Sequence, residues 1–438
     1  MESIEELETR STVSRFETLM IMLSVFISSI VFFKSPFEGY FHYIVFALLL
    51  PFFMLRYGPP VFLLIPFGVL TVVGLIHIVA GNDTAFQFVK IFVGMLLSVS
   101  FYYYVLRHFK FDTVRLFKLY LKGSFIAAMI GVMQLVAFRL HITRLYDFHW
   151  IFNKWGLAFG SIGGIRVNSI FSEPSQCAIV LAPAAMVAAY EILLRRHNLL
   201  KRYQAYIILF VEFFTFSSVG YIGFFLIFLL LAINFGRISM FLLVIVFGIL
   251  VAVGLYQIVP EFQLRVDSTI ALWVHQDYAV ENVNTSSFVL YNNFHVAWES
   301  FKTNFLVGTG LGSHPVAFER YSLTAGGDFL GFSFNQSDGN SLFIRLMSET
   351  GLLGLVFMFV LIRRHFVRRR QGDNQYWLIS SSLLIIIILY LFRQGNYFVN
   401  GFPFFVWMYY YNSKVYREQQ LLKEEQGEEL QQDSPITG

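Results

Sequence analysis

Long apolar runs constrain the fold of this chain more than any other feature of its sequence. A helix needs about 20 apolar residues to cross a bilayer. By that measure the sequence predicts twelve spans, near Leu19–Phe33, Tyr40–Leu55, Pro60–Ala80, Phe86–Leu106, Leu119–Phe138, Gln176–Leu194, Tyr203–Phe216, Tyr221–Phe235, Ile238–Ile258, Ser341–Ile362, Trp377–Phe392 and Phe398–Tyr411. The chain is 56% hydrophobic and only 14% charged, a composition typical of an integral membrane protein. We therefore predict an all-α polytopic membrane protein of about twelve transmembrane helices.

The positions of Lys and Arg predict how these spans are oriented. Cationic loops are retained on the cytoplasmic side of a membrane. Four connections are basic, and with twelve spans all four fall on one face: Arg107 to Lys118, Arg195 to Arg202, Arg237, and Arg363 to Arg370. Both termini are then expected in the cytoplasm. The segments expected outside are 139–175 and 259–339.

Four regions follow from this topology. We expect a first transmembrane bundle over 1–258, which contains nine spans and the outer segment 139–175. A large outer loop covers 259–339, a second bundle of three spans covers 340–412, and a cytoplasmic tail covers 413–438. A loop as long as 259–339 is usually functional, and its aromatic residues indicate that it folds.

The run NFLVGTGLGSHP stands out within the large loop. Its glycines, Gly308, Gly310 and Gly312, permit a tight turn or a close backbone approach to a ligand. The run lacks the strand-to-helix setting and the downstream Lys of a nucleotide site. The loop's histidines, His314 among them, are too dispersed to indicate a metal site, and Cys177 is the only cysteine. The sequence therefore predicts no metal.

Ionisable residues within apolar runs are candidates for function because each costs roughly 2.5–3.5 kcal/mol on insertion scales. Six fall in or beside the predicted spans: Lys90, Glu191, Glu212, Arg345, Glu349 and Arg393. We expect Lys90 and Glu191 to reach water along their own stems. Arg345 and Glu349 are spaced for an ion pair on one helix face. For Glu349 and Arg393, a structural role and a functional role both remain open.

The outer segment ends in GSIGGIRVNSIFSEPSQCA. Pro174 suits the first position of a helix and Ser172 its N-cap, and Glu173 suits the first turn, where the helix dipole favours an acid. Arg166 is either a solvated side chain or a phosphate ligand, since its planar fork matches phosphate oxygens. Together with Arg265, also on the outer face, it could clamp a pyrophosphate.

Four phrases in order resemble the bacterial O-antigen polymerase and O-antigen ligase group of membrane glycosyltransferases. They are RVNSIFSEPSQCA, FTFSSVGYIG, NFLVGTGLGS and NSLFIRLMSETGLLGL, spread over the latter two thirds of the chain. The resemblance implies a GT-C-like fold in the bacterial inner membrane. It also implies undecaprenyl-pyrophosphate-linked oligosaccharides as donor and acceptor, with Arg166 and Arg265 matching the arginines that hold the pyrophosphate. Neither a cofactor nor nucleic acid is expected.

The chain departs from the ligase pattern at one position of that family's motif. Asn340 stands where ligase members have a His that serves as the base, and an amide cannot take a proton from an attacking hydroxyl. The remaining candidates for the base are Glu173, Asp338, Glu349 and His314. We also expect substrate contacts from His314, Asn340 and Arg393, and from Arg320, which with Gly331 fits an arginine-to-glycine spacing described for polymerases.

The predicted function is therefore a polymerase, which transfers a growing glycan from undecaprenyl pyrophosphate to a lipid-linked repeat unit on the periplasmic side. Members of the family it resembles commonly work with a chain-length regulator protein, which is a further expected partner. Two alternatives remain open: a ligase that delivers glycan to lipid A core, and a flippase or transporter of lipid-linked glycan that carries out no chemistry.

Overall fold

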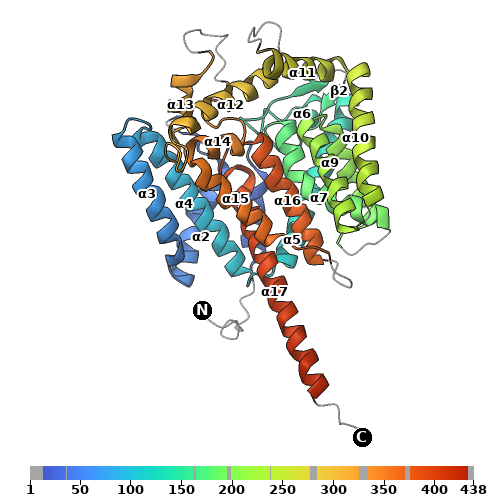
Figure 1. Cartoon of the computed structure of the whole chain (residues 1–438). Helices are drawn as coiled ribbons and strands as arrows, with labels where there is room; N and C mark the ends of the chain where they lie inside the picture. The colour runs from blue at the N-terminus through green and yellow to red at the C-terminus, as the bar shows by residue number, and fades with distance from the viewer. Residues whose placement is uncertain are drawn as a thin grey trace.

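Helices make up most of the computed structural model, which describes residues 13–35, 37–160, 164–194, 199–236, 238–276, 284–324, 334–369 and 375–432. Figure 1 shows long helices side by side in a bundle. The elements in chain order are α1 (Arg15–Phe26), α2 (Phe41–Tyr57), η2 (Val61–Leu63), α3 (Leu64–Val79), α4 (Ala85–His108), α5 (Thr113–Arg139), α6 (Thr143–Tyr146), β1 (Ala158–Gly160), β2 (Gly164–Arg166), α7 (Pro174–Leu194), α8 (Arg202–Phe214), α9 (Ser218–Asn234), α10 (Ile238–Ile258), α11 (Pro260–Ile270), η3 (Ala271–His275), α12 (Thr285–Thr303), α13 (His314–Tyr321), α14 (Leu342–Glu349), α15 (Gly351–His365), α16 (Gln375–Arg393), η5 (Val399–Gly401) and α17 (Phe402–Gln432).

Six helical segments of the described chain are long and apolar enough to cross a membrane: Val61–Val79, Ala85–His108, Thr113–Arg139, Pro174–Leu194, Phe241–Ile258 and Gln375–Arg393. The helices Phe41–Tyr57 and Ser218–Asn234 are apolar but shorter. This confirms the prediction of an all-α membrane protein. The predicted number of twelve long spans is not reached.

Early helix ends and helix breaks explain part of the difference between twelve predicted spans and six long ones. Helix α1 has 12 residues and ends at Phe26, so it rises about 18 Å against the ~30 Å of a hydrocarbon core. The run Ser341–Ile362 is divided into α14 and α15 at Gly351, which has a φ of +60°. Hydropathy averaged over a window as long as a span does not reveal such a break, because the apolar residues on both sides outweigh the few polar ones beside it.

Helix α7 lies at the centre of the bundle and packs against α5, α8, α9 and α16. Nearly all of its side chains are buried, and many of them are alanine. Small side chains let neighbouring helices approach closely within a membrane. The helix begins at Pro174, as predicted. Its cap lies one residue later than predicted, since the carbonyl of Glu173 rather than Ser172 accepts from the backbone N–H of Cys177.

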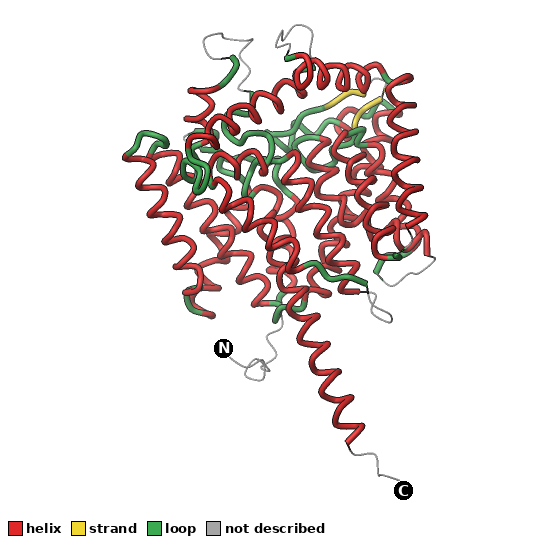
Figure 2. Tube along the Cα trace, viewed as in Figure 1, coloured by secondary structure: helices red, strands yellow, loops and turns green. Residues whose placement is uncertain are grey.

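Most of the longer loops lie at one end of the bundle (Figure 2), which also carries α6, β2 and α11 to α13 (Figure 1) and is called the loop end below. The predicted large loop does fold: α12 and α13 pack around a small core of Leu272, Phe288, Val296 and Phe318. The C-terminal part of α17 leaves the bundle at the opposite end (Figure 1).

The glycine run of the large loop forms a tight turn, as predicted, but its close approach is to the protein's own backbone. A Cβ on Gly308, whose φ is +71°, would lie 2.4 Å from the backbone of Glu349. A Cβ on Gly312, whose φ is +97°, would lie 2.7 Å from the carbonyl oxygen of Gln87. The turn therefore docks the large loop onto α4 and the end of α14.

Candidate functional site

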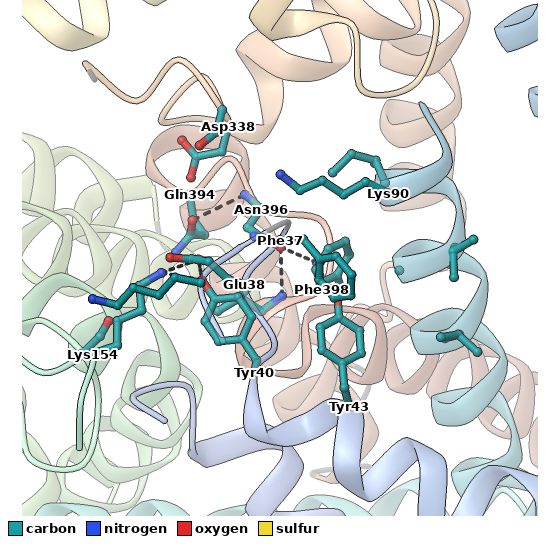
Figure 3. A pocket seen from close by; sticks show the side chains of 18 of the residues that line it. Phe37, Glu38, Tyr40, Tyr43, Lys90, Lys154, Asp338, Gln394, Asn396 and Phe398 are labelled. Atoms are coloured by element: carbon teal, nitrogen blue, oxygen red, sulfur yellow. Dashed lines mark hydrogen bonds and ion pairs between the residues drawn. The ribbon is translucent and has the colours of Figure 1, made fainter. Parts of the chain in front are cut away.

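A cavity of about 1350 Å³ opens among α2, α4, the end of α16 and the loop-end connections. Its described lining divides into a charged part and an apolar part. The charged part holds five bases and three acids: Lys34, Lys90, Lys154, Arg345, Arg393, Glu38, Glu173 and Asp338. Figure 3 shows Lys90 reaching across the cavity from α4, opposite the pair formed by Lys154 and Glu38.

Lys154, Glu38 and Tyr40 form a charged network on one wall of the cavity. The ammonium of Lys154 donates to the Glu38 carboxylate and, at 2.6 Å, to the Tyr40 hydroxyl, which itself donates to Glu38. Burial raises the pKa of Glu38, but the hydrogen bonds from Lys154 and Tyr40 outweigh burial and leave it below the ordinary value. Glu38 is therefore a paired carboxylate and a poor proton acceptor.

Arg345 presents a rigid guanidinium to the cavity. Its Nε donates to Glu349 Oε1 at 2.7 Å, its Nη1 donates to the Gly395 carbonyl at 3.1 Å, and the guanidinium lies 4.4 Å from the centre of the Tyr397 ring. The predicted ion pair between Arg345 and Glu349 is thus confirmed. The remaining nitrogen, Nη2, has no hydrogen-bond partner among the described residues. Arg345 is 1% exposed, so this nitrogen is a buried donor with no room beside it for a ligand atom in this arrangement.

Asp338 and Asn340 enter the same cavity from the segment before α14. Asp338 Oδ1 accepts from the backbone N–H of Asn340 at 3.0 Å, which fixes the turn. Gly395 is essential to this arrangement, because a Cβ there would lie 1.6 Å from the Asp338 carbonyl oxygen. The close approach of the two segments brings Asp338 beside Arg393 and Arg345, both of which it influences electrostatically.

Three arginines gather around Glu173 at the edge of the cavity; they are Arg166, Arg265 and Arg393, called the arginine cluster below. Arg166 Nε donates to the Thr215 carbonyl at 3.3 Å, and Arg265 Nη1 donates to Ser218 Oγ at 3.0 Å. Burial and the nearby charge of Arg265 lower the pKa of Arg166, against the opposing effect of Glu173. Arg393 interacts with Arg265 and Glu173 as well. Three guanidinia that act on one another electrostatically make this a candidate anion site.

The apolar part of the cavity is a groove between α2 and α4. Helix α2 contributes Phe46, Ala47, Leu50 and Met54, and α4 contributes Phe86, Val89, Val93 and Leu97. Several of these side chains stay well exposed, with Met54 at 44% and Val89 at 53%. The groove runs from the charged part of the cavity along the two helices.

The structure brings together six of the residues that the sequence singled out. Glu173, Asp338, Asn340 and Arg393 line the cavity, and Arg166 and Arg265 adjoin it through the arginine cluster. These residues come from β2, the start of α7, α11, the turn before α14 and the end of α16.

Three of the predicted site residues lie elsewhere. Glu349 is 1% exposed, and its two carboxylate oxygens are occupied by Arg345 and by the Tyr397 hydroxyl at 2.8 Å. His314 is buried between Ser348 and Asn293, each 3.0 Å from a ring nitrogen, and burial lowers its pKa to about 3. Both groups are therefore bound within the protein rather than placed to accept a substrate proton.

Arg320 is exposed and holds α13 to the turn before α4. Its guanidinium donates to Asn82 Oδ1 at 2.9 Å and to the Gly81 carbonyl. Its predicted partner Gly331 lies outside the described residues.

Sequence reasoning missed the lysine-rich wall of the cavity and the groove. Lys90 was expected to snorkel, yet it lines the cavity one helical turn from Phe86 and from Val93. That spacing on α4 was the available signal. Nothing in the sequence indicated that Lys154 lines the cavity. Its position depends on the packing of residues 153–156 against residues 29–40, which are distant in sequence.

Comparisons with known proteins do not assign a family or a function to this chain. No protein-family model matches the chain, and no curated protein matches it.

Proposed function

We propose that this protein is a membrane glycosyltransferase, a surface-polysaccharide polymerase that extends glycans carried on undecaprenyl pyrophosphate. The observation that carries the proposal is the cavity, in which a cluster of charged side chains meets an apolar groove between two membrane helices. A polyprenyl-diphosphate glycan has the same division, with an anionic head between a sugar and a long hydrocarbon chain. Its recognition needs cations and an apolar channel side by side.

The arrangement suits transfer of a glycosyl group. The acceptor hydroxyl oxygen forms a bond to the anomeric carbon of the donor sugar, and the bond from that carbon to the diphosphate oxygen breaks. The diphosphate leaves with the electron pair, and the arginine cluster stabilises the charge that develops on it. The hydroxyl proton passes to a carboxylate, for which Glu173 and Asp338 are the candidates that line the cavity.

The proposal includes a place in the cell and a topology. We place the loop end in the periplasm and the bundle in the bacterial inner membrane, with both termini cytoplasmic. Twelve crossings would be completed by the six long segments, the helices α2, α8, α9, α15 and α17, and the run Leu19–Phe33, of which α1 forms only the first part. The four basic connections favour this number. A chain-length regulator protein is the proposed partner.

A reconstituted assay tests this function. Purified full-length protein in proteoliposomes is given an undecaprenyl-pyrophosphate-linked repeat unit, and products are separated on a gel. We expect a ladder from the wild type and none from Glu173→Gln or Arg166→Gln. Arg144→Gln serves as the control, since Arg144 is an exposed residue on α6 that does not line the cavity.

Two outcomes would replace the proposal. A single capped product that forms only when lipid A core is added would make the protein a ligase. Movement of the lipid-linked unit across the bilayer without any new glycosidic bond would make it a transporter.

A further inference from the structure

Cations lie in two places at the cavity: Lys90 stands within its lining beside the α2–α4 groove, and the arginine cluster adjoins it through Arg393. We propose that this groove is a second lipid-carrier site: it holds the polyprenyl chain of the acceptor substrate, with the acceptor's phosphates on Lys90. The arginine cluster then holds the diphosphate of the donor. This inference rests on the proposed function and assigns each lipid-linked substrate its own site.

The groove has the form of a channel for an extended hydrocarbon chain. Positions 43, 46, 47, 50, 51 and 54 of α2 line it at the three- and four-residue spacing of a single helix face, and positions 86, 89, 93 and 97 of α4 do the same. Eleven residues of helix rise about 16 Å, which is roughly half of a hydrocarbon core. Two parallel helix faces thus offer a continuous apolar path.

An anion site stands at the head of this groove. Lys90 lines the cavity there, and Arg345, which also borders it, is almost fully buried. Because Glu349 balances the charge of Arg345 at 2.7 Å, the free positive charge comes from Lys90, which is close enough to interact with Arg345. A phosphate bound to Lys90 Nζ would balance this charge.

Asp338 interacts electrostatically with arginines on both sides of the charged part of the cavity. It acts electrostatically on Arg345, beside the groove, and on Arg393, which belongs to the arginine cluster. Glu173 acts on Arg166 and Arg393. A donor on the arginine cluster and an acceptor on Lys90 would therefore place their sugars on either side of Asp338, where a carboxylate can orient the attacking hydroxyl.

A lipid suits the groove because the groove's cationic head adjoins its apolar walls without a break. Lys90 projects from the same face of α4 as Phe86 and Val93. A free phosphate would contact only the head of the groove and leave its apolar length unfilled. A lipid with a phosphate or diphosphate head fills both.

Counting bound carriers tests the inference without any chemistry. Full-length protein in nanodiscs is titrated with undecaprenyl diphosphate, which has no glycan to transfer, and complexes are counted by native mass spectrometry. We expect two lipids on the wild type. Ala47→Phe fills the groove at an exposed position, and Lys90→Gln removes its charge. Each should weaken the binding of one of the two lipids by at least about tenfold, the scale of one lost charge-assisted contact.

Controls separate an occupied groove from a damaged fold. Leu48→Phe changes a neighbouring exposed residue that does not line the cavity and should keep two lipids, as should Lys90→Arg. Arg166→Gln should lose the other lipid, and Ala47→Phe combined with Arg166→Gln should lose both. Inorganic pyrophosphate should compete far more weakly than undecaprenyl diphosphate for the site that Ala47→Phe removes.

The inference is overturned if the wild type binds a single carrier, if Ala47→Phe still binds two, or if pyrophosphate competes equally well. These results are distinct from failure of the proposed function. A protein that makes a glycan ladder but binds one carrier has no second site, whereas a protein that binds two carriers but forms no glycosidic bond is not a polymerase.

Discussion

At the scale of single residues, the site depends on which charges are already paired. Glu349 and His314 looked like proton acceptors in the sequence, but the protein itself occupies their polar atoms. Glu173 and Asp338 remain on the cavity. The sequence could identify all four as candidates, but it could not sort them, because pairing depends on partners such as Tyr397 that only the fold brings near.

Glu349→Gln should therefore lower the stability of the folded protein rather than remove a catalytic base. Loss of one partner leaves the buried Arg345 guanidinium uncompensated, at a cost of roughly 3–5 kcal/mol. We expect a clearly lower thermal midpoint in detergent, and Arg345→Met combined with Glu349→Met should recover much of it. A Glu349→Gln protein with unchanged stability and no ladder would instead make Glu349 the base.

Asp83 makes the stability of the fold depend on pH, and this dependence can be measured. Burial raises the pKa of this carboxyl, which sits beside the glycine turn, to about 7. In the unfolded chain the same group titrates near pH 4, so the folded state binds the proton more tightly. Its contribution to stability is complete below about pH 4 and is lost as pH rises to about 7.

Asp83→Asn should remove that dependence. Asn keeps an acceptor for the Thr84 backbone N–H, which Asp83 Oδ1 binds at 2.7 Å. Thermal midpoints of the two proteins, measured in detergent between pH 4 and pH 8, should diverge in favour of the variant as pH rises. A constant difference across that range would contradict the assignment.

At the scale of elements, the site is made where distant segments approach each other closely. The sequence predicted the start of α7 at Pro174 and a tight turn at the glycine run, because both depend on local backbone chemistry. It did not predict that Gly395 lets the segment carrying Asp338 lie against the end of α16. Glycine is common in loops, and nothing local distinguishes one that makes such a contact.

Gly395→Ala should move Asp338 away from the cavity. The added Cβ would lie 1.6 Å from the Asp338 carbonyl oxygen, so the segment must shift. We expect loss of most ladder-forming activity, at least about tenfold, while the helix content of the protein measured by circular dichroism is retained. Gly254→Ala on α10, where a Cβ meets nothing within 4 Å, is the matched control and should be as active as the wild type.

At the scale of the whole molecule, the fold places a charged chamber at the loop end of a membrane bundle. Composition alone predicted the membrane class, and the positions of arginines and acids predicted much of the site. The groove was not predicted, because a lysine within an apolar run looks the same in sequence whether it reaches water or a cavity. The number of long spans was also overestimated, since a break such as the one at Gly351 changes the hydropathy averaged over a whole span too little to be noticed.

The account's central claim is that the protein transfers a glycan from one lipid carrier to another. The most direct measurement is the release of undecaprenyl pyrophosphate, followed by mass spectrometry, during glycan growth in proteoliposomes that contain only this protein. We predict one carrier released for each glycosidic bond formed, and neither release nor growth with Glu173→Gln. If the lipid-linked unit crosses the bilayer or stays unchanged while no carrier is released, the protein is not a glycosyltransferase and the account is wrong.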